Sequence, residues 1–584
     1  MIKELKDELS KEAYTNLIKW LSDDEYSSFR NEINELIEQK KYSYIEDCFY
    51  KHIEIGTGGI RGSLGPGPNK INLRTIGEAA QALCQFMKEV SPESMDMGVV
   101  IGHEVRKNSV PFASLCASVL AANGIKSYLF DSFRATPEIS FAVRHLGAVA
   151  GIQLTASHNP RTDNGFKFYW TDGGQVVPPL DQKFMELVQN VDEVKQMGFE
   201  EAKARGYVTV IGEDVDKIYW RKVRDLSVSK SRSAKIVFSP IHGAGSKNVL
   251  PVLTQEGFDV FVVPEQAEPD ENFPTAVGDL INPEYIEVME LPMKYGKEKG
   301  ADLVINSDPD ADRIGVASKI NLDSNDVRFL TGNQLGVLLT EFLLNKKKNA
   351  GELNSSNLIL ETYVTTSLIA KIARSYGIKV TDDLLVGFKF IAEIIEKLEN
   401  KNDFLFAAEE SLGYLAGSFV RDKDASIAAL LAAEMVSELK DQNKTMVDYL
   451  DEIYKKYGYF KNILRMVELP GKEGAGNIRK IMLGLRNRDW PEIGGKKVLR
   501  VIDRLPEEKR DEGVYKTGSA KDMITFVFSD DDLCRITARP SGTEPKVKYY
   551  IQFWGDYKES ESIDSDAKNV ELGMLEIQEK IINS

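Results

Sequence analysis

The chain has 584 residues, 42% hydrophobic and 28% charged, which is ordinary for a globular protein of three to five domains. Its net charge of -16 disfavours a nucleic-acid-binding surface, although a local basic pocket for a phosphorylated ligand remains compatible with it. The sequence contains no signal-peptide core, no apolar run long enough to cross a membrane and no metal-like cysteine spacing, so a cytoplasmic protein with buried thiols is expected.

The N-terminal half begins with helices. Residues 1–50 are predicted to form amphipathic helices, because apolar side chains recur there at helical spacing. After a glycine-rich stretch, a helix at 75–90 and a buried strand at 98–102 begin an alternation of strands and helices. Ser109 is the expected N-cap of the helix that follows.

Strand-like runs continue through the middle of the chain, at 234–239, 258–263, 302–306 and 356–361. Helical patterns separate them, and this alternation predicts α/β domains with parallel sheets. In the tail, strand-like runs follow one another closely before a helix near 566–582, which predicts a smaller α+β domain with an antiparallel sheet. The expected domains are 1–205, 206–325, 326–445 and 446–584.

A serine-containing turn follows the strand predicted to end at Leu154. Residues 155–160 read TASHNP, which would place Ser157 exposed at the carboxyl end of a strand, where α/β proteins bind ligands. A serine there can be a nucleophile or a phosphate carrier, whereas the simpler alternative is a serine that caps a turn. Lys167 is a candidate general base, and its simpler alternative is a solvated lysine.

Three aspartates, Asp308, Asp310 and Asp312, stand two apart directly after a predicted strand. This spacing suits one hard cation such as Mg²⁺. An EF-hand is excluded because Arg313 stands where that loop requires glycine. A solvated acidic turn is the alternative, but carboxylates crowded after an apolar strand would repel one another, and a cation would relieve this repulsion. The pattern favours a metal site.

Two further loops are suited to a phosphorylated sugar. Residues 539–543 offer a guanidinium, two hydroxyls and backbone amides freed by a glycine, a combination that can hold phosphate. Glu409 and Ser411, two apart on a predicted turn, could grip neighbouring sugar hydroxyls. Each pattern alone is also typical of a polar surface turn, and residues 387–389 and 421–424 are weaker signals.

Taken together and in this order, the motifs resemble those of the α-D-phosphohexomutase family, over nearly the whole chain from about Gly56 to Tyr550. The family's loops read T-A/G-S-H-N-P, D-x-D-x-D-R, G-E-x-S and R-x-S-G/N-T, which correspond here to 155–160, 308–313, 408–411 and 539–543. The G-T-x-G-x-R-G element is complete at 56–62. The segments 239–243 and 273–275 are most similar to the longer, phosphoglucomutase-2-like branch, which includes phosphopentomutases and bisphosphate synthases.

Three positions depart from the family pattern. Ala408 replaces the usual glycine before the sugar-loop glutamate, and Glu104 stands where an aspartate is usual. Val386 stands where a threonine is common, which bears on sugar selectivity rather than on the chemistry.

The resemblance implies an α/β, four-domain architecture, in which three mixed α/β domains and a smaller C-terminal α+β domain surround a central cleft. It implies that Ser157 carries phosphate and, with Asp308, Asp310 and Asp312, binds Mg²⁺. Catalysis would also use Lys167, His158 and Arg61. The residues implied to bind substrate are Gly387, Phe388, Lys389, Glu409, Ser411, Lys423, Arg539, Ser541, Gly542, Thr543 and Arg313.

The activity expected from this resemblance is that of a phosphoglucomutase, acting through a hexose 1,6-bisphosphate that also serves as activator. A phosphomannomutase or dual-specificity mutase, a phosphopentomutase and a glucose-1,6-bisphosphate synthase remain alternatives. A catalytically silent sugar-phosphate-binding paralogue is disfavoured because the serine and the aspartates are all present. The expected partner is a sugar phosphate, with no nucleic acid and no membrane, and the expected state is a monomer or weak dimer.

Overall fold

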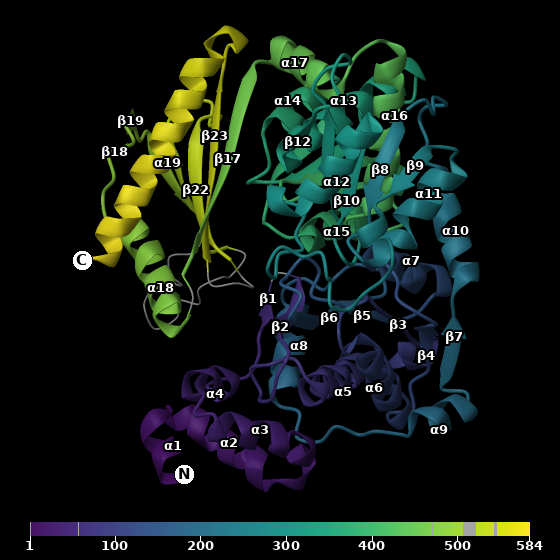
Figure 1. The fold of residues 1–584 in the computed structure, drawn as a ribbon, viewed down its shortest axis with the longest axis vertical. Helices are drawn as coiled ribbons and strands as arrows, with labels where there is room; N and C mark the ends of the chain where they lie inside the picture. The colour runs from purple at the N-terminus through teal and green to yellow at the C-terminus, as the bar shows by residue number, and fades with distance from the viewer. Residues whose placement is uncertain (1, 57, 470, 506–520, 542–545) are drawn as a thin grey trace.

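Four large sheets follow one another along the chain, as the computed structural model shows (Figure 1). The structure describes residues 2–56, 58–469, 471–505, 521–541 and 546–584. The α/β class and the division into four parts expected from the sequence are confirmed.

The N-terminal end of the chain, purple in Figure 1, is helical. It comprises α1 (Ile2–Glu8), α2 (Lys11–Ser22), η1 (Asp24–Phe29), α3 (Arg30–Glu38) and α4 (Tyr42–Phe49). These helices bury a small core of their own, in which the ring of Trp20 stacks on Tyr26 with centroids 4.6 Å apart. The amphipathic helices predicted for the first 50 residues are therefore confirmed.

The first sheet has seven strands in the order β1-β2-β6-β5-β3-β4-β7. They are β1 (Ile55–Gly56), β2 (Gly59–Ser63), β3 (Val99–His103), β4 (Ser127–Phe130), β5 (Ala150–Leu154), β6 (Asp163–Tyr169) and β7 (Val208–Ile211). The helices of this part are α5 (Leu73–Val90), η2 (Pro92–Met97), α6 (Ser109–Ala122), α7 (Thr136–Leu146), α8 (Leu180–Gln189) and α9 (Phe199–Ala204). β7 lies beyond the proposed domain boundary at residue 205, yet it pairs in parallel with β4.

The start of α6 differs from the sequence prediction. Ser109 is the first helical residue rather than the N-cap, and Asn108 holds the cap position with φ of 67° and no side-chain cap hydrogen bond. Asparagine tolerates this left-handed conformation better than most residues, which explains how the chain turns into the helix at Asn108.

The second sheet has the order β12-β11-β10-β8-β9, and the third has the order β14-β13-β15-β16. The second part comprises α10 (Glu213–Arg224), β8 (Lys235–Ser239), η3 (Ala244–Ser246), α11 (Val249–Gln255), β9 (Asp259–Val262), η4 (Pro264–Gln266), α12 (Ile286–Lys299), β10 (Leu303–Ser307), β11 (Ile314–Lys319) and β12 (Val327–Leu330). The third comprises α13 (Gly332–Asn349), β13 (Leu358–Thr362), α14 (Leu368–Ser375), β14 (Lys379–Leu384), α15 (Phe388–Lys397), η5 (Lys401–Asp403), β15 (Phe404–Glu409), β16 (Gly413–Ala416), α16 (Ala425–Asp441) and α17 (Met446–Tyr457). In both sheets parallel strands are joined by antiparallel edge pairs, so the sheets are mixed.

The C-terminal sheet is antiparallel throughout, in the order β17-β23-β22-β21-β20, as the sequence predicted. This part comprises β17 (Tyr459–Glu468), α18 (Gly471–Asn487), β18 (Glu492–Ile493), β19 (Lys496–Lys497), β20 (Arg500–Asp503), β21 (Ile524–Val527), β22 (Arg535–Pro540), β23 (Lys546–Gly555), η7 (Tyr557–Glu559) and α19 (Ser560–Ile582). Figure 1 shows it set to one side of the other sheets.

The hydrophobic cores follow this division only in part. One core joins the second and third sheets with α7 of the first part, through side chains such as Phe141, Phe238 and Leu430. The C-terminal sheet packs against α18 and α19 around a separate core. The four cysteines are free thiols, three of them buried. No helix within the described ranges has both the length and the apolar character needed to cross a membrane.

Candidate active site

Strands from three sheets end beside one another and carry the predicted loops. β5 leads into the loop of Ser157, β10 into the three aspartates, and β15 into the loop of Ser411. The aspartate and sugar loops are joined directly, because Arg313 forms an antiparallel bridge with Gly413. The carboxyl ends of the strands thus gather the motifs, as expected for α/β proteins.

Ser157 lies at the centre of this junction. Its hydroxyl donates a hydrogen bond to Asp308 Oδ2 at 3.2 Å and lies 3.2 Å from His158 Nδ1. The sequence predicted an exposed serine, and this is wrong: Ser157 is fully buried because the aspartate loop covers it. Its φ of 54° places it in the left-handed region, which is uncommon for a residue with a Cβ.

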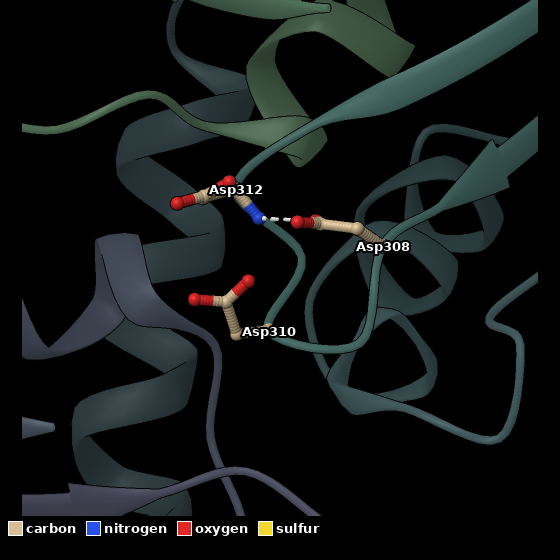
Figure 2. A group of neighbouring side chains, drawn as sticks. All are labelled: Asp308, Asp310 and Asp312. Atoms are coloured by element: carbon tan, nitrogen blue, oxygen red, sulfur yellow. Dashed lines mark hydrogen bonds between the residues drawn. The ribbon is translucent and has the colours of Figure 1, made fainter. Parts of the chain in front are cut away.

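The three aspartates form a compact, buried cluster (Figure 2). One carboxylate oxygen from each of the three lies within 4.8 Å of the others. Asp308 Oδ1 accepts hydrogen bonds from the backbone N–H groups of Asp312 and Arg313, both at 3.0 Å. Asp310 Oδ1 is buried and accepts none. Burial, together with the charges of Asp312 and Asp310, raises the pKa of Asp308 well above its usual range. A hard cation would fit this donor set and relieve the repulsion.

Lys167 on β6 reaches the same cluster from the first sheet. Its ammonium group donates to Asp310 Oδ2 at 2.7 Å and to Asp312 Oδ2 at 3.1 Å, and its side chain is fully buried. The alternative of a solvated lysine is therefore wrong. The hydroxyl of Thr136, at the start of α7, donates to Asp310 Oδ2 at 2.5 Å. Thr136 belongs to none of the motifs, so no sequence pattern indicated this contact.

Cations and a neutral imidazole surround Ser157. Burial lowers the pKa of His158 well below its usual range, and the charges of Arg313 and Arg61 lower it further. This favours the neutral imidazole, which has one unprotonated ring nitrogen. The Nε atoms of Arg61 and Arg313 are buried and form no hydrogen bond. Guanidinium groups of this kind suit a phosphate oxygen.

The residues expected to bind sugar meet beside the aspartate loop. Glu409 Oε1 accepts the backbone N–H of Gly387 at 3.1 Å. Lys423 Nζ lies 3.0 Å from Asp312 Oδ2 and 5.8 Å from the centroid of the Phe388 ring. Lys423 was expected to help hold a substrate phosphate, and the structure shows it paired with Asp312 of the aspartate cluster.

Two other expected substrate residues have structural partners. Lys389 Nζ pairs with Asp181 of α8 at 2.8 Å, which links the third part of the chain to the first. The carbonyl oxygen of Ser411 accepts a hydrogen bond from Arg313 Nη1 at 3.1 Å. These contacts hold the loops together without engaging the Ser411 hydroxyl.

The phosphate loop starts at the end of β22. Arg539 is buried and stands directly opposite Lys548 of β23, so the two side chains share one face of the sheet. The backbone N–H of Ser541 donates to the carbonyl of Lys546 at 2.8 Å. Gly542 and Thr543 lie outside the described residues.

Lys548 is a candidate that the motifs missed. Burial lowers its pKa, and its charge contributes to the lowered pKa of His158. Lysines at 546 and 548, alternating directly after the phosphate motif, were the sequence signal that could have indicated it. A cavity of about 240 Å³ separates this sheet from the sugar loop and is lined by Glu410 and Tyr550, among others.

Comparisons with known proteins show the family to which the chain belongs. Models of phosphoglucomutase/phosphomannomutase α/β/α domains I, II and III match residues 52–195, 215–320 and 331–457. A phosphoglucomutase of Staphylococcus saprophyticus is 34% identical over 545 residues, covering 90% of this chain and 93% of that protein. A protein of Schizosaccharomyces pombe named "probable phosphoribomutase" is 31% identical over 561 residues, covering 91% and 92%.

Solved structures share the fold. The open form of Paramecium pp63/parafusin, a phosphoglucomutase, matches with a TM-score of 0.63 at 17% identity and covers 91% of this chain and 96% of its own. A phosphoglucomutase/phosphomannomutase family protein of Burkholderia thailandensis matches with a TM-score of 0.62 at 16% identity, covering 90% and 98%. The chain belongs to the phosphoglucomutase/phosphomannomutase family and is a phosphotransferase mutase, an isomerase of phosphorylated sugars.

Proposed function

We propose that this chain interconverts glucose 1-phosphate and glucose 6-phosphate, with Ser157 as the phosphoryl carrier and glucose 1,6-bisphosphate as the intermediate. The observation that supports this most is the Ser157 hydroxyl, buried 3.2 Å from Asp308 Oδ2 within the aspartate cluster. The 34% identity to a named phosphoglucomutase favours glucose as the sugar.

The aspartate cluster is proposed to hold Mg²⁺, with Asp308, Asp310, Asp312 and the phosphorylated Ser157 as ligands. The buried Asp310 oxygen without a hydrogen bond supports this assignment. The bound cation would supply positive charge that offsets the negative charge on the transferring phosphoryl group. Arg61 and Arg313 supply further positive charge from the protein itself.

Transfer is proposed to run from phosphoserine to a sugar hydroxyl. The hydroxyl oxygen bonds to phosphorus as the bond between phosphorus and Ser157 Oγ breaks, and the hydroxyl loses its proton. Lys167 is the candidate base for that proton. Its ammonium group pairs with Asp310 and Asp312, so it would take the proton as the free amine, after those carboxylates had turned to the cation instead. The neutral imidazole of His158, 3.2 Å from Ser157 Oγ, can exchange a proton at the serine oxygen. The return step moves the other phosphate of the bisphosphate back to Ser157.

The substrate must bind in two orientations, so the residues that bind its hydroxyls must suit both. Glu409 and Ser411 are proposed to hold the 3- and 4-hydroxyls, which take similar places in either orientation. Arg539 and Ser541, with Gly542 and Thr543 as sequence-based members of the loop, are proposed to hold the phosphate that is not being transferred. Two further basic side chains, Lys389 and Lys423, complete the proposed substrate-binding set, along with Gly387 and Phe388.

A pentose phosphate is the second candidate substrate, because the Schizosaccharomyces pombe relative is named a phosphoribomutase. Val386 stands where the family commonly has threonine, and this difference is compatible with a pentose substrate. Val386 packs with Tyr363, Met523 and Tyr550 at the junction of the third part with the C-terminal sheet.

Side-by-side kinetics of three sugar phosphates test the substrate. We expect kcat/KM to fall in the order glucose 1-phosphate, mannose 1-phosphate, ribose 1-phosphate, because the loop need not read the 2-hydroxyl and a pentose lacks the C6 arm. Glu409→Ala should lower kcat/KM for both hexoses by about tenfold or more, since each loses a charge-assisted hydrogen bond. Glu399→Ala, at an exposed glutamate of the same part of the chain, is the matched control. A wild-type preference for ribose 1-phosphate over both hexoses would establish the pentose reading instead.

A further inference from the structure

The guanidinium of Arg106 forms all of its hydrogen bonds with groups of the protein itself. Its side chain is fully buried. Its two terminal nitrogens donate four hydrogen bonds, at 2.6 to 2.8 Å, to backbone carbonyls of a single loop, those of Ser157, Asn159, Pro160 and Asp163. No motif of the sequence assigned Arg106 a role, yet it gathers the carbonyls of the loop that carries the serine.

Glu104 holds the other side of the same loop. Its Oε1 accepts hydrogen bonds from Arg106 Nε at 2.7 Å, from the Thr155 hydroxyl at 2.5 Å and from the backbone N–H of Ala156 at 3.2 Å. The Thr155 oxygen in turn accepts the backbone N–H of Ser157 at 2.7 Å. Both peptide groups that flank Ser157 are therefore fixed, its N–H through Thr155 and its carbonyl through Arg106.

These hydrogen bonds hold Ser157 in an unfavourable backbone conformation. Ser157 has a φ of 54°, a left-handed conformation that costs free energy for a residue with a Cβ and persists only where its surroundings enforce it. In that conformation its hydroxyl lies 3.2 Å from Asp308 Oδ2. A relaxed loop would turn the hydroxyl away from the aspartates.

The second part of the chain covers the bracing arginine. Phe273 is fully buried, and the centroid of its ring lies 5.8 Å from Arg106 Cζ. The same segment is tied to the serine loop, because Arg161 Nε donates to Asp279 at 2.9 Å and Arg161 Nη1 to the carbonyl of Asn272 at 3.2 Å. The arginine is thus enclosed between two parts of the chain, where its hydrogen bonds are shielded from water.

We propose that Arg106 and Glu104 are positioning residues, which hold the backbone of Ser157 in the geometry that phosphoryl transfer requires. This inference rests on the proposed role of Ser157 as phosphoryl carrier. Arginine suits the task because its planar fork reaches carbonyls on two sides at once, whereas a lysine ammonium cannot span them.

The test compares Arg106→Lys with Arg134→Lys. Arg134 is an equally buried arginine of the same part, but its guanidinium donates to Asp216, Asp131 and Ser132 rather than to the serine loop. Arg106→Lys should lower kcat by about 100-fold or more, since small displacements of a reacting group have this cost, with KM within about threefold. Arg134→Lys should leave kcat within about threefold, whatever it does to Tm. Equal kcat losses in the two variants, or a kcat near wild type in Arg106→Lys, would overturn the proposal.

A second pair of variants covers the case in which Arg106→Lys does not fold. Thr155→Val keeps the side-chain shape but removes the oxygen that accepts the Ser157 N–H, so kcat should fall about tenfold with KM nearly unchanged. Thr155→Ser keeps the oxygen and should recover most of that loss. If both variants have the same kcat, the hydrogen bond does not position the serine. Ser157→Ala separates the two proposals, because activity in that variant would refute the carrier role itself, independently of Arg106.

Discussion

The surroundings of Ser157 and of Arg539 are built differently. Near Ser157, charged side chains from three sheets pair directly with one another, whereas Arg539 lies on a strand of the C-terminal sheet, which packs around a separate core. Lys167 of the first sheet pairs with two aspartates of the second, and Lys423 from the third pairs with one of them. Arg539 has its neighbouring cation, Lys548, on the adjacent strand of the same sheet.

Under the proposed function, this difference separates the reacting end of the site, around Ser157, from the end that would recognise the substrate, around Arg539. Phosphoryl transfer depends on the fixed placement of charges, and burial between several parts of the chain provides it. Recognition of a distant phosphate requires charge and hydrogen-bond donors, which one strand end can carry. A change at the reacting end should therefore affect metal, geometry and packing together, and a change at the recognition end should affect substrate binding alone.

The largest loss of activity is expected from a change in the aspartate cluster. Asp310→Asn removes one proposed anionic ligand and one of the two carboxylates that pair with Lys167, so Mg²⁺ affinity should fall and activity should drop by roughly 100-fold or more. Chelation should abolish wild-type activity, and added Mg²⁺ should restore it. Asp259→Asn, at an exposed carboxylate on β9, is the control and should change neither quantity. Full activity after thorough chelation would refute the metal assignment.

A smaller effect is expected at Arg539. Arg539→Ala should lose a charge-assisted hydrogen bond to phosphate, about 1.5–3 kcal/mol in kcat/KM, while Mg²⁺ affinity stays at the wild-type value. Arg500→Ala, at an exposed arginine on β20 of the same sheet, should leave kcat/KM unchanged. If Arg539→Ala instead weakened Mg²⁺ binding and left substrate kinetics alone, the division between the two ends would fail.

The smallest effect is a pH dependence of stability at Glu410, in the cavity between the C-terminal sheet and the sugar loop. Burial, and then the charge of Glu409, raises the pKa of Glu410 from 4.5 to about 7. Because the folded state binds this proton more tightly than the unfolded state, the stability that the carboxyl contributes is complete below pH 4.5 and lost as pH rises through 7. The Tm of wild type relative to Glu410→Gln should therefore fall between these pH values. A constant Tm difference across this range would contradict the assignment.

The sequence predicted the reacting loops better than the links between them. Ser157 and the three aspartates followed predicted strands. β5 ends at Leu154 as expected and β10 ends one residue beyond the predicted 306, because local periodicity and turn residues carry that information. The contact from Ser157 to Asp308 spans 151 positions in sequence and could be expected only from the family resemblance. Local patterns contain nothing about which strand ends face one another.

The missed residues share a physical cause. Thr136 contacts the site through its hydroxyl, and Arg106 contacts it by donating to backbone carbonyls. Contacts of these two kinds leave no spacing pattern in the sequence. The burial of Ser157 was missed for the same reason, since it depends on loops from other sheets. Lys423 was identified, but its pairing with Asp312 follows from packing between the second and third parts.

The transfer of phosphate from Ser157 to the sugar can be followed directly in a single-turnover experiment. Wild-type enzyme carrying labelled phosphate, mapped to Ser157 by peptide mass, is mixed with unlabelled glucose 1-phosphate and quenched over time, with Ser157→Ala as the unlabelled control. The label is expected to leave Ser157 and to appear in glucose 1,6-bisphosphate at least as fast as steady-state turnover. Label that stays on the protein, lies on another residue, or moves more slowly than turnover would refute Ser157 as the phosphoryl carrier.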